Sequence, residues 1–210
     1  MTEAVQASIP SAAGPVPAIW YPVEHAPGAL VLVGGAGGGT YGPSGVYPDV
    51  AERMQWLDVA ALLLDYRHPN TLSECVADVE SGLAWLAERH ITRVALVGWS
   101  FGGAVVIRAG AASPAVVGVA TIASQTYGTD AVSRLAPRSA LFIHGSRDTV
   151  LPDICSRTLF AQAGQPKELV IYSGDGHGIE LHRAERLEKL SMWAKDLLLP
   201  KQEISTETAP

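Results

Sequence analysis

A serine between two glycines is the clearest sign of chemistry in this sequence. The segment Gly98-Trp99-Ser100-Phe101-Gly102 matches Gly-x-Ser-x-Gly, the pattern of a sharp turn that presents a nucleophilic serine. It follows an apolar run typical of a strand, at 93–97, and opens a run of small residues typical of a helix. The N-terminal N–H groups of such a helix favour developing negative charge. The sequence therefore predicts a reachable nucleophile at Ser100; an ordinary glycine-rich helix start is the competing interpretation.

A serine hydroxyl is a weak nucleophile near neutral pH and needs a base. His177 lies in Gly174-Asp175-Gly176-His177-Gly178, directly after the last predicted strand, and the glycines let this loop place the imidazole over the end of the sheet. The competing interpretation is a solvated surface residue. We interpret His144 as a structural residue at a strand end, and the other four histidines as surface residues.

The acid that orients this base is expected between the serine and the histidine, because the chain order Ser, Asp, His accompanies this type of turn. Asp148 lies between a predicted strand and a predicted helix. A carboxylate there can hold the imidazole and stabilise its cation. Its competing interpretation is a turn or a helix cap. Asp153 falls inside a predicted helix, and Asp175 is too close to His177 in sequence to face it.

These side chains need strands that end at one edge of a sheet. Apolar runs alternate with amphipathic runs along the chain, which indicates an α/β fold with a mostly parallel sheet and helices on both faces. The predicted strands are 29–33, 59–64, 93–97, 116–122, 140–144 and 167–172. The predicted helices are 47–57, 73–89, 101–112, 152–163 and 183–198.

The ends of the chain differ from this alternating part. Two short segments within residues 1–22 are predicted to form an antiparallel hairpin at one edge of the sheet, and the polar tail 201–210 is predicted to be disordered. No linker or repeat divides the chain, so we expect one domain over 1–210. Between residues 93 and 130 Arg108 is the only charged residue. Because glycines and a proline interrupt this stretch, we interpret it as buried strand, helix and strand rather than a membrane span.

Composition excludes several classes of function. Charged residues make up 17% of the 210 residues and the net charge is −6, so we expect neither nucleic-acid binding nor membrane insertion. Cys75 and Cys155 lie far apart without metal-ligand spacing, so no metal site is expected. The first ten residues do not resemble a secretory signal, and the thiols suit a reducing compartment, so the predicted location is cytoplasmic.

The three motifs, at Ser100, Asp148 and His177, resemble the α/β-hydrolase family, and the resemblance covers residues 29–198. The similarity is to small members without a lid, such as dienelactone-hydrolase-type esterases. Dienelactone hydrolases carry a cysteine nucleophile where this chain has Ser100. Related enzymes often insert a lid after the strand that corresponds to 116–122, and here only residues 123–138 intervene. The resemblance therefore implies an open, shallow site without a lid domain.

The glycine cluster 34–39 follows another predicted strand. Such a cluster can cradle a pyrophosphate, but no helix follows it at once; Asp65, at the end of the next strand, keeps the nucleotide alternative open. The resemblance implies instead that Ala36 in this loop and Phe101 supply the two N–H groups of an oxyanion hole. Weaker candidates for the substrate pocket are Gly35, Gly37, Tyr41, Trp99 and Tyr127.

The resemblance implies hydrolysis of carboxylic esters, short-chain or with exposed acyl groups, through an acyl-enzyme on Ser100. His177 is the expected base, and Asp148 is expected to orient it. The expected partner is a small-molecule ester, and no cofactor is expected. The protein is expected to be a monomer or a homodimer. Thioester hydrolysis, acyl transfer to another acceptor and perhydrolysis use the same groups and stay open. A binding protein on the same fold is the alternative from another class, and the presence of all three candidate residues argues against it.

Overall fold

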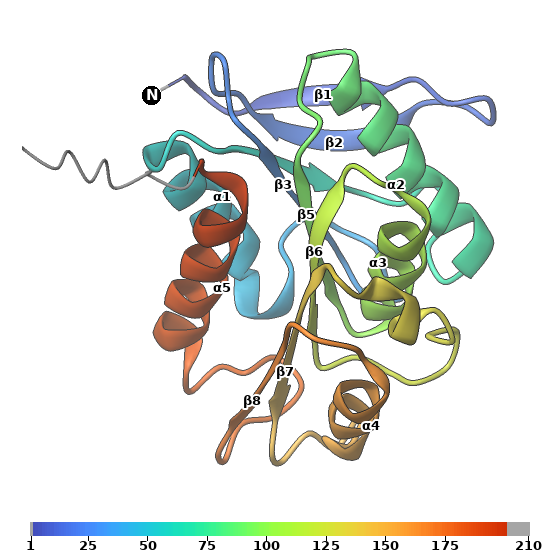
Figure 1. Ribbon diagram of the computed structural model, residues 1–210, viewed down its shortest axis with the longest axis vertical. Helices are drawn as coiled ribbons and strands as arrows, with labels where there is room; N and C mark the ends of the chain where they lie inside the picture. The colour runs from blue at the N-terminus through green and yellow to red at the C-terminus, as the bar shows by residue number, and fades with distance from the viewer. Residues whose placement is uncertain (1, 201–210) are drawn as a thin grey trace, which may run out of the picture.

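The computed structural model describes residues 2–200, and Figure 1 shows a central sheet with helices on both sides. The strands are β1 (Val5–Ile9), β2 (Val16–Tyr21), β3 (Ala29–Val33), β4 (Ala60–Leu64), β5 (Val94–Trp99), β6 (Val116–Ile122), β7 (Ser139–Gly145) and β8 (Lys167–Tyr172). The helices are α1 (Val46–Trp56), α2 (Leu72–Ala87), α3 (Phe101–Ala112), α4 (Ile154–Gln162) and α5 (Arg183–Leu198), with short 3-10 helices η1 (Pro43–Gly45) and η2 (Val132–Leu135). The tail predicted at 201–210 lies outside the described residues.

The strands form one sheet in the order β1-β2-β4-β3-β5-β6-β7-β8. The six strands from β3 to β8 are parallel, whereas β1 pairs antiparallel with β2, and β2 antiparallel with β4, at one edge. Every residue of β3 and β4 is buried, because helices cover both faces of the sheet. This confirms the predicted α/β class with a mostly parallel sheet.

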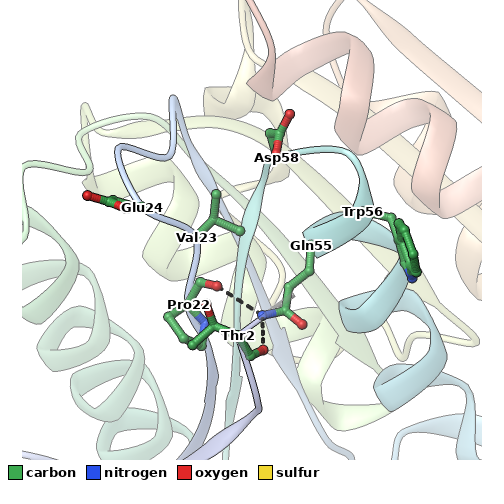
Figure 2. Close-up of a pocket in the computed structure, with 7 residues that line it drawn as sticks. All are labelled: Thr2, Pro22, Val23, Glu24, Gln55, Trp56 and Asp58. Carbon is green, nitrogen blue, oxygen red and sulfur yellow. Dashed lines mark hydrogen bonds between the residues drawn. The ribbon is translucent and has the colours of Figure 1, made fainter.

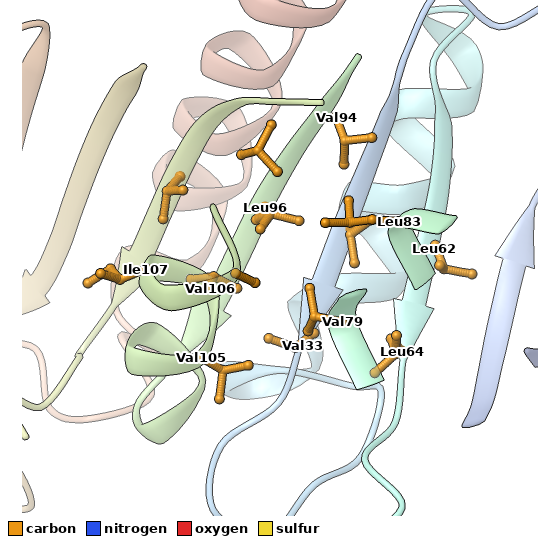
Figure 3. Close-up of a cluster of buried hydrophobic side chains, with 14 of the residues drawn as sticks. Val33, Leu62, Leu64, Val79, Leu83, Val94, Leu96, Val105, Val106 and Ile107 are labelled. Carbon is orange, nitrogen blue, oxygen red and sulfur yellow. The ribbon is translucent and has the colours of Figure 1, made fainter. Parts of the chain in front are cut away.

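The two faces of the sheet have separate apolar cores. Helices α1 and α5 cover one face, and α2, α3 and α4 cover the other (Figure 1). Adjacent residues of a strand alternate between the two: Val31 belongs to the core under α2 and α3, and Leu32 to the core under α1 and α5. Figure 3 shows the first core, in which Val79 of α2 and Val105 of α3 meet strand side chains such as Leu96.

The weakly charged stretch forms β5, α3 and β6, as predicted. Within residues 2–200, every helix is either too short or too polar to cross a bilayer. Helix α3 lies close against β6: a Cβ at Gly110 would lie 2.5 Å from Val119 Cγ2. The connection between β6 and β7, residues 123–138, contains η2 and no inserted lid domain.

Candidate active site

Ser100 occupies the turn between β5 and α3 in a strained backbone conformation, with φ 56° and ψ −120°. A positive φ is costly for a residue with a side chain, and such strain collects at functional sites. Backbone hydrogen bonds hold the turn: Ser100 N–H donates to Ile122 O at 2.8 Å, and Gly103 N–H donates to Ser100 O at 3.0 Å. The residue is partly exposed. The fold therefore holds this serine fixed at the carboxyl end of the sheet, in reach of solvent.

Close backbone contacts around Ser100 require glycine. A Cβ at Gly98 would lie 2.1 Å from Gly102 O, and a Cβ at Gly102 would lie 2.3 Å from Gly34 O. Both distances are far inside van der Waals contact, so a side chain at either position would push the turn or the loop after β3 away. The glycines of the motif thus let three backbone segments meet beside the serine.

His177 and Asp148 are joined by a hydrogen bond. His177 Nδ1 lies 2.7 Å from Asp148 Oδ2, and the other oxygen of Asp148 accepts the N–H groups of Val150 at 2.8 Å and Leu151 at 2.9 Å. The Asp148 side chain is fully buried, whereas the His177 side chain is 16% exposed. Burial by itself raises the pKa of Asp148, but the hydrogen bonds from His177, Leu151 and Val150 outweigh it and hold that pKa below its ordinary value.

Trp99 brings the His177 loop to the serine turn. Its indole N–H donates to His177 O at 3.2 Å, and the two ring centroids are 5.5 Å apart. Since Trp99 directly precedes Ser100, this contact places the imidazole beside the turn. Nδ1 of His177 is used by Asp148, which leaves Nε2 for the serine side. No hydrogen bond joins the Ser100 hydroxyl to His177 here; without substrate this bond is often long in hydrolytic enzymes.

The glycine loop after β3 lies against Ser100. A Cβ at Gly35 would lie 3.4 Å from Ser100 Cβ, and Gly38 N–H donates to Gly35 O at 3.0 Å, which closes a tight turn with Ala36 at its exposed tip. Asp65 Oδ1 accepts Gly39 N–H at 2.6 Å and so fixes the far end of the loop. Asp65 is the residue on which the alternative of a nucleotide-binding site depends. In the structure its carboxylate binds the glycine loop instead.

The remaining candidate residues lie at the same edge of the sheet but differ in how near they are to Ser100 and His177. Phe101 is the first residue of α3, so its N–H has no acceptor within the helix. Gly37 is exposed, and the side chains of Tyr41 and Tyr127 are 70% and 79% exposed. Neither tyrosine forms a hydrogen bond or an aromatic pair with His177, whose ring partner is Trp99. The structure thus brings together Trp99, His177 and Asp148, and leaves the two tyrosines at the rim.

One histidine, His182, differs from the sequence interpretation, and a second, His144, agrees with it but has a partner that the sequence did not indicate. His182 is not a simple surface residue: its Nδ1 lies 2.5 Å from Asp175 Oδ2, and its ring stacks on Tyr172 with centroids 5.1 Å apart. Asp175 therefore binds His182 and not His177. His144 does lie at a strand end, but its Nε2 is 3.1 Å from Asp148 Oδ2. The two residues are four positions apart, in His144-Gly-Ser-Arg-Asp148 across a strand end, and this spacing is the feature of the sequence that could have indicated the pair.

The cavity in Figure 2 lies away from this site. Its lining residues are Thr2, Pro22, Val23, Glu24, Gln55, Trp56 and Asp58. Asp58 precedes β4, so the cavity is at the amino ends of the parallel strands. The amide of Gln55 already donates to Thr2 O at 3.1 Å and Pro22 O at 2.9 Å. Ser100 and His177 line neither this cavity nor four further hollows on residues 2–200. Within those residues no three His, Cys, Asp or Glu side chains converge as a metal site requires.

No protein-family model and no curated protein matches this chain. Solved structures do match it. A dienelactone hydrolase from Anabaena variabilis superposes with a TM-score of 0.84 at 20% identity, covering 94% of this chain and 99% of its own. An esterase domain from Rhodothermus marinus gives 0.79 at 16%, covering 94% and 100%. A serine hydrolase without a lid from Xanthomonas campestris gives 0.74 at 18%, covering 95% and 97%.

Proposed function

Because the chain has the α/β-hydrolase fold, we propose that it is a serine hydrolase that cleaves carboxylic esters. The observation that carries this proposal is the His177–Asp148 hydrogen bond of 2.7 Å, located by Trp99 beside the strained turn of Ser100. An activated serine needs a base that is itself oriented by a third group. The names of the three similar structures, all hydrolases or esterases, agree with this chemistry.

In the proposed reaction, Ser100 Oγ attacks the ester carbonyl carbon while His177 Nε2 takes the hydroxyl proton. The tetrahedral intermediate collapses, the bond to the alcohol oxygen breaks, and His177 returns the proton to that oxygen. This leaves the acyl group on Ser100. A water molecule then attacks the acyl-enzyme with the same help from His177. The products are an alcohol and a carboxylic acid, and Ser100 is restored.

Asp148 supports His177 in both steps. Its pKa lies below the ordinary value, so the carboxylate is ionised at neutral pH, when the base is needed. The carboxylate accepts the Nδ1–H of His177, which fixes the tautomer with a free Nε2 and stabilises the imidazolium that forms during attack. The two backbone N–H groups on Oδ1 keep the carboxylate from turning away.

We assign the binding of the oxyanion to the backbone N–H groups of Ala36 and Phe101. Phe101 follows the nucleophile at the start of α3, and Ala36 sits at the tip of the glycine loop, in which a Cβ at Gly35 would lie 3.4 Å from Ser100 Cβ. Donors fixed by the backbone stabilise the developing charge without reorganisation, and each is worth roughly 3 kcal/mol. Asp65 holds the loop that carries Ala36, so it maintains this donor indirectly.

The rim of the site indicates its substrates. Within residues 2–200, four large apolar side chains are well exposed between a strand end and the following helix, namely Tyr41, Tyr127, Val150 and Leu181, and Ile154 is exposed at the first position of α4. All five lie at the carboxyl edge of the sheet, on the side of Ser100. Such a rim, with no lid over it, suits a short acyl chain or an apolar group that rests on the surface rather than in a deep tunnel.

A panel of p-nitrophenyl esters tests this function. We expect faster turnover of the acetate and butyrate than of the palmitate, because none of the five hollows described on residues 2–200 reaches Ser100 to hold a long chain. Matched acyl thioesters in the same panel separate an esterase from a thioesterase. Folded Ser100→Ala is the control and should be inactive towards all of them. Palmitate as the best substrate would contradict the open site, and no hydrolysis of any ester would contradict the function itself.

A further inference from the structure

A second histidine binds the carboxylate that orients His177. His144, at the end of β7, is fully buried and takes no part in the reaction described above. Its Nε2 lies 3.1 Å from Asp148 Oδ2 and 2.9 Å from Leu151 O, and its Nδ1 lies 2.7 Å from Ser156 Oγ. Ser156, on α4, is also fully buried. Buried polar side chains that form one continuous chain of hydrogen bonds into an active site invite a functional explanation.

The partners of His144 fix where its hydrogen lies. A carbonyl oxygen only accepts, so the contact with Leu151 O requires the hydrogen on Nε2. The same Nε2–H points to the carboxylate of Asp148. In the neutral ring Nδ1 is an acceptor, and the hydroxyl of Ser156 supplies the donor. The hydrogen bonds therefore run from Ser156 to His144 and on to Asp148.

One oxygen of Asp148 is shared by two histidines. Oδ2 accepts His177 Nδ1 at 2.7 Å and His144 Nε2 at 3.1 Å. The second donor keeps this oxygen pointed at His177. The second donor also weakens the hydrogen bond from His177, since one carboxylate oxygen divides its stabilisation between its two donors.

We infer that His144 is a positioning residue of this active site: it holds Asp148 and sets the pH range in which His177 works as a base. This rests on the proposed function. A carboxylate relieved of His144 would bind the His177 cation more tightly, so His177 would stay protonated, and inactive as a base, up to a higher pH.

Other titratable groups on the neighbouring elements do not replace His144. On α4, burial first and then the charges of Asp148 and Asp153 raise the pKa of Cys155, so its thiol is neutral near pH 7. On the loop after β8, Asp175 and His182 bind each other. Among the described side chains, His144 and His177 are therefore the donors on Asp148.

Two substitutions of His144 separate positioning from packing. The side-chain nitrogen of glutamine falls near the place of Nε2, so His144→Gln keeps a donor for Asp148. The nitrogen of asparagine falls near Nδ1, so His144→Asn keeps the partner of Ser156 and loses that donor. We expect the acidic limb of the kcat/KM–pH profile to move up by about one pH unit in His144→Asn and to stay near wild type in His144→Gln. Cys155→Ser, beside Ser156, is the matched control and should not move the limb.

An NMR titration of the His177 ring, assigned with His177→Ala, gives a readout that does not depend on catalysis. Its transition should move to higher pH in His144→Asn by the same amount as the acidic limb. If the wild type hydrolyses no ester, the proposed function fails, while this titration still tests the His144–Asp148–His177 coupling.

Two results would overturn the inference: a His177 transition that is the same in wild type and His144→Asn, or equal shifts in His144→Asn and His144→Gln. If neither variant folds, Ser156→Ala carries the test, because it removes the hydroxyl that makes His144 Nε2–H a stronger donor. A smaller upward shift, about half a pH unit or less, is then expected, and an unchanged transition in Ser156→Ala counts against the inference.

Discussion

Replacing His177 by alanine is expected to lower kcat/KM for a minimal ester by roughly 10⁴ to 10⁶-fold while the fold is retained. The reason is that His177 is the base beside Ser100, and a serine hydroxyl without a base is a weak nucleophile. His177 lies in a loop and belongs to neither apolar core, so its truncation leaves the packing of helices on the sheet intact. Steady-state hydrolysis of p-nitrophenyl acetate, with circular dichroism to verify folding, measures the effect.

His182→Ala is the matched control for this substitution. His182 lies five positions further along, and like His177 it binds a buried carboxylate through Nδ1, at 2.5 Å from Asp175. We expect His182→Ala to lose less than about tenfold in kcat/KM, because its carboxylate does not touch the reacting groups. Near wild-type turnover in His177→Ala, or an equal loss in both variants, would remove His177 from the mechanism.

Replacing Asp148 by asparagine is expected to lower kcat/KM by about 10⁴-fold. An amide keeps the size of the side chain but does not stabilise the imidazolium, and its NH₂ group favours the tautomer with hydrogen on Nε2 of His177. That tautomer leaves no acceptor for the serine proton. The same steady-state assay, with substrate held well below KM, measures the loss.

Asp175→Asn is the control here. Asp175 is as deeply buried, and it too accepts a backbone N–H, from Leu181 at 2.8 Å, and a histidine Nδ1. A loss of about 10⁴ in Asp175→Asn and none in Asp148→Asn would show that the acid is assigned wrongly.

The lowered pKa of Asp148 adds a second readout, in stability. Because that pKa is lower in the folded than in the unfolded chain, ionised Asp148 stabilises the fold above about pH 4, and this contribution is lost as the pH falls through the folded-state pKa. We therefore expect Asp148→Asn to lower the free energy of unfolding at neutral pH, with the difference from wild type shrinking in acid. Urea unfolding of both proteins at neutral and acidic pH measures this.

The sheet and the serine turn could be predicted because their signals are local. Runs such as 29–33 and 60–64 are apolar throughout, which a strand buried on both faces demands. Helix α2 begins at Leu72, one residue before the predicted start. The glycines around Ser100 are set by contacts within a few residues and by the neighbouring loop, so their pattern is visible in the sequence.

The pairing of side chains within the site could not be predicted in the same way. Asp175 binds His182, seven residues further along, and His144 binds Asp148, four residues further along, although several other polar groups lie equally close in sequence. Buried Arg186 shows how contacts between distant segments place a loop of the site. It donates to Gly178 O, next to His177, and to Pro43 O at 3.1 Å, and so joins the loop after β8 to the loop before α1. Residue types and order indicate which groups reach the sheet edge, but long-range contacts of this kind decide which of them meet.

Labelling with a fluorophosphonate reveals whether Ser100 is an activated nucleophile. The reagent reacts when a serine oxygen displaces fluoride from phosphorus, and only an activated serine does so readily. Intact mass and peptide mapping of wild type and Ser100→Ala should show one adduct on Ser100 in the wild type and none in the variant. Folded wild-type protein that takes up no label, or takes it up at another residue, would show that Ser100 is not activated and favour a protein that binds its ligand without cleaving it.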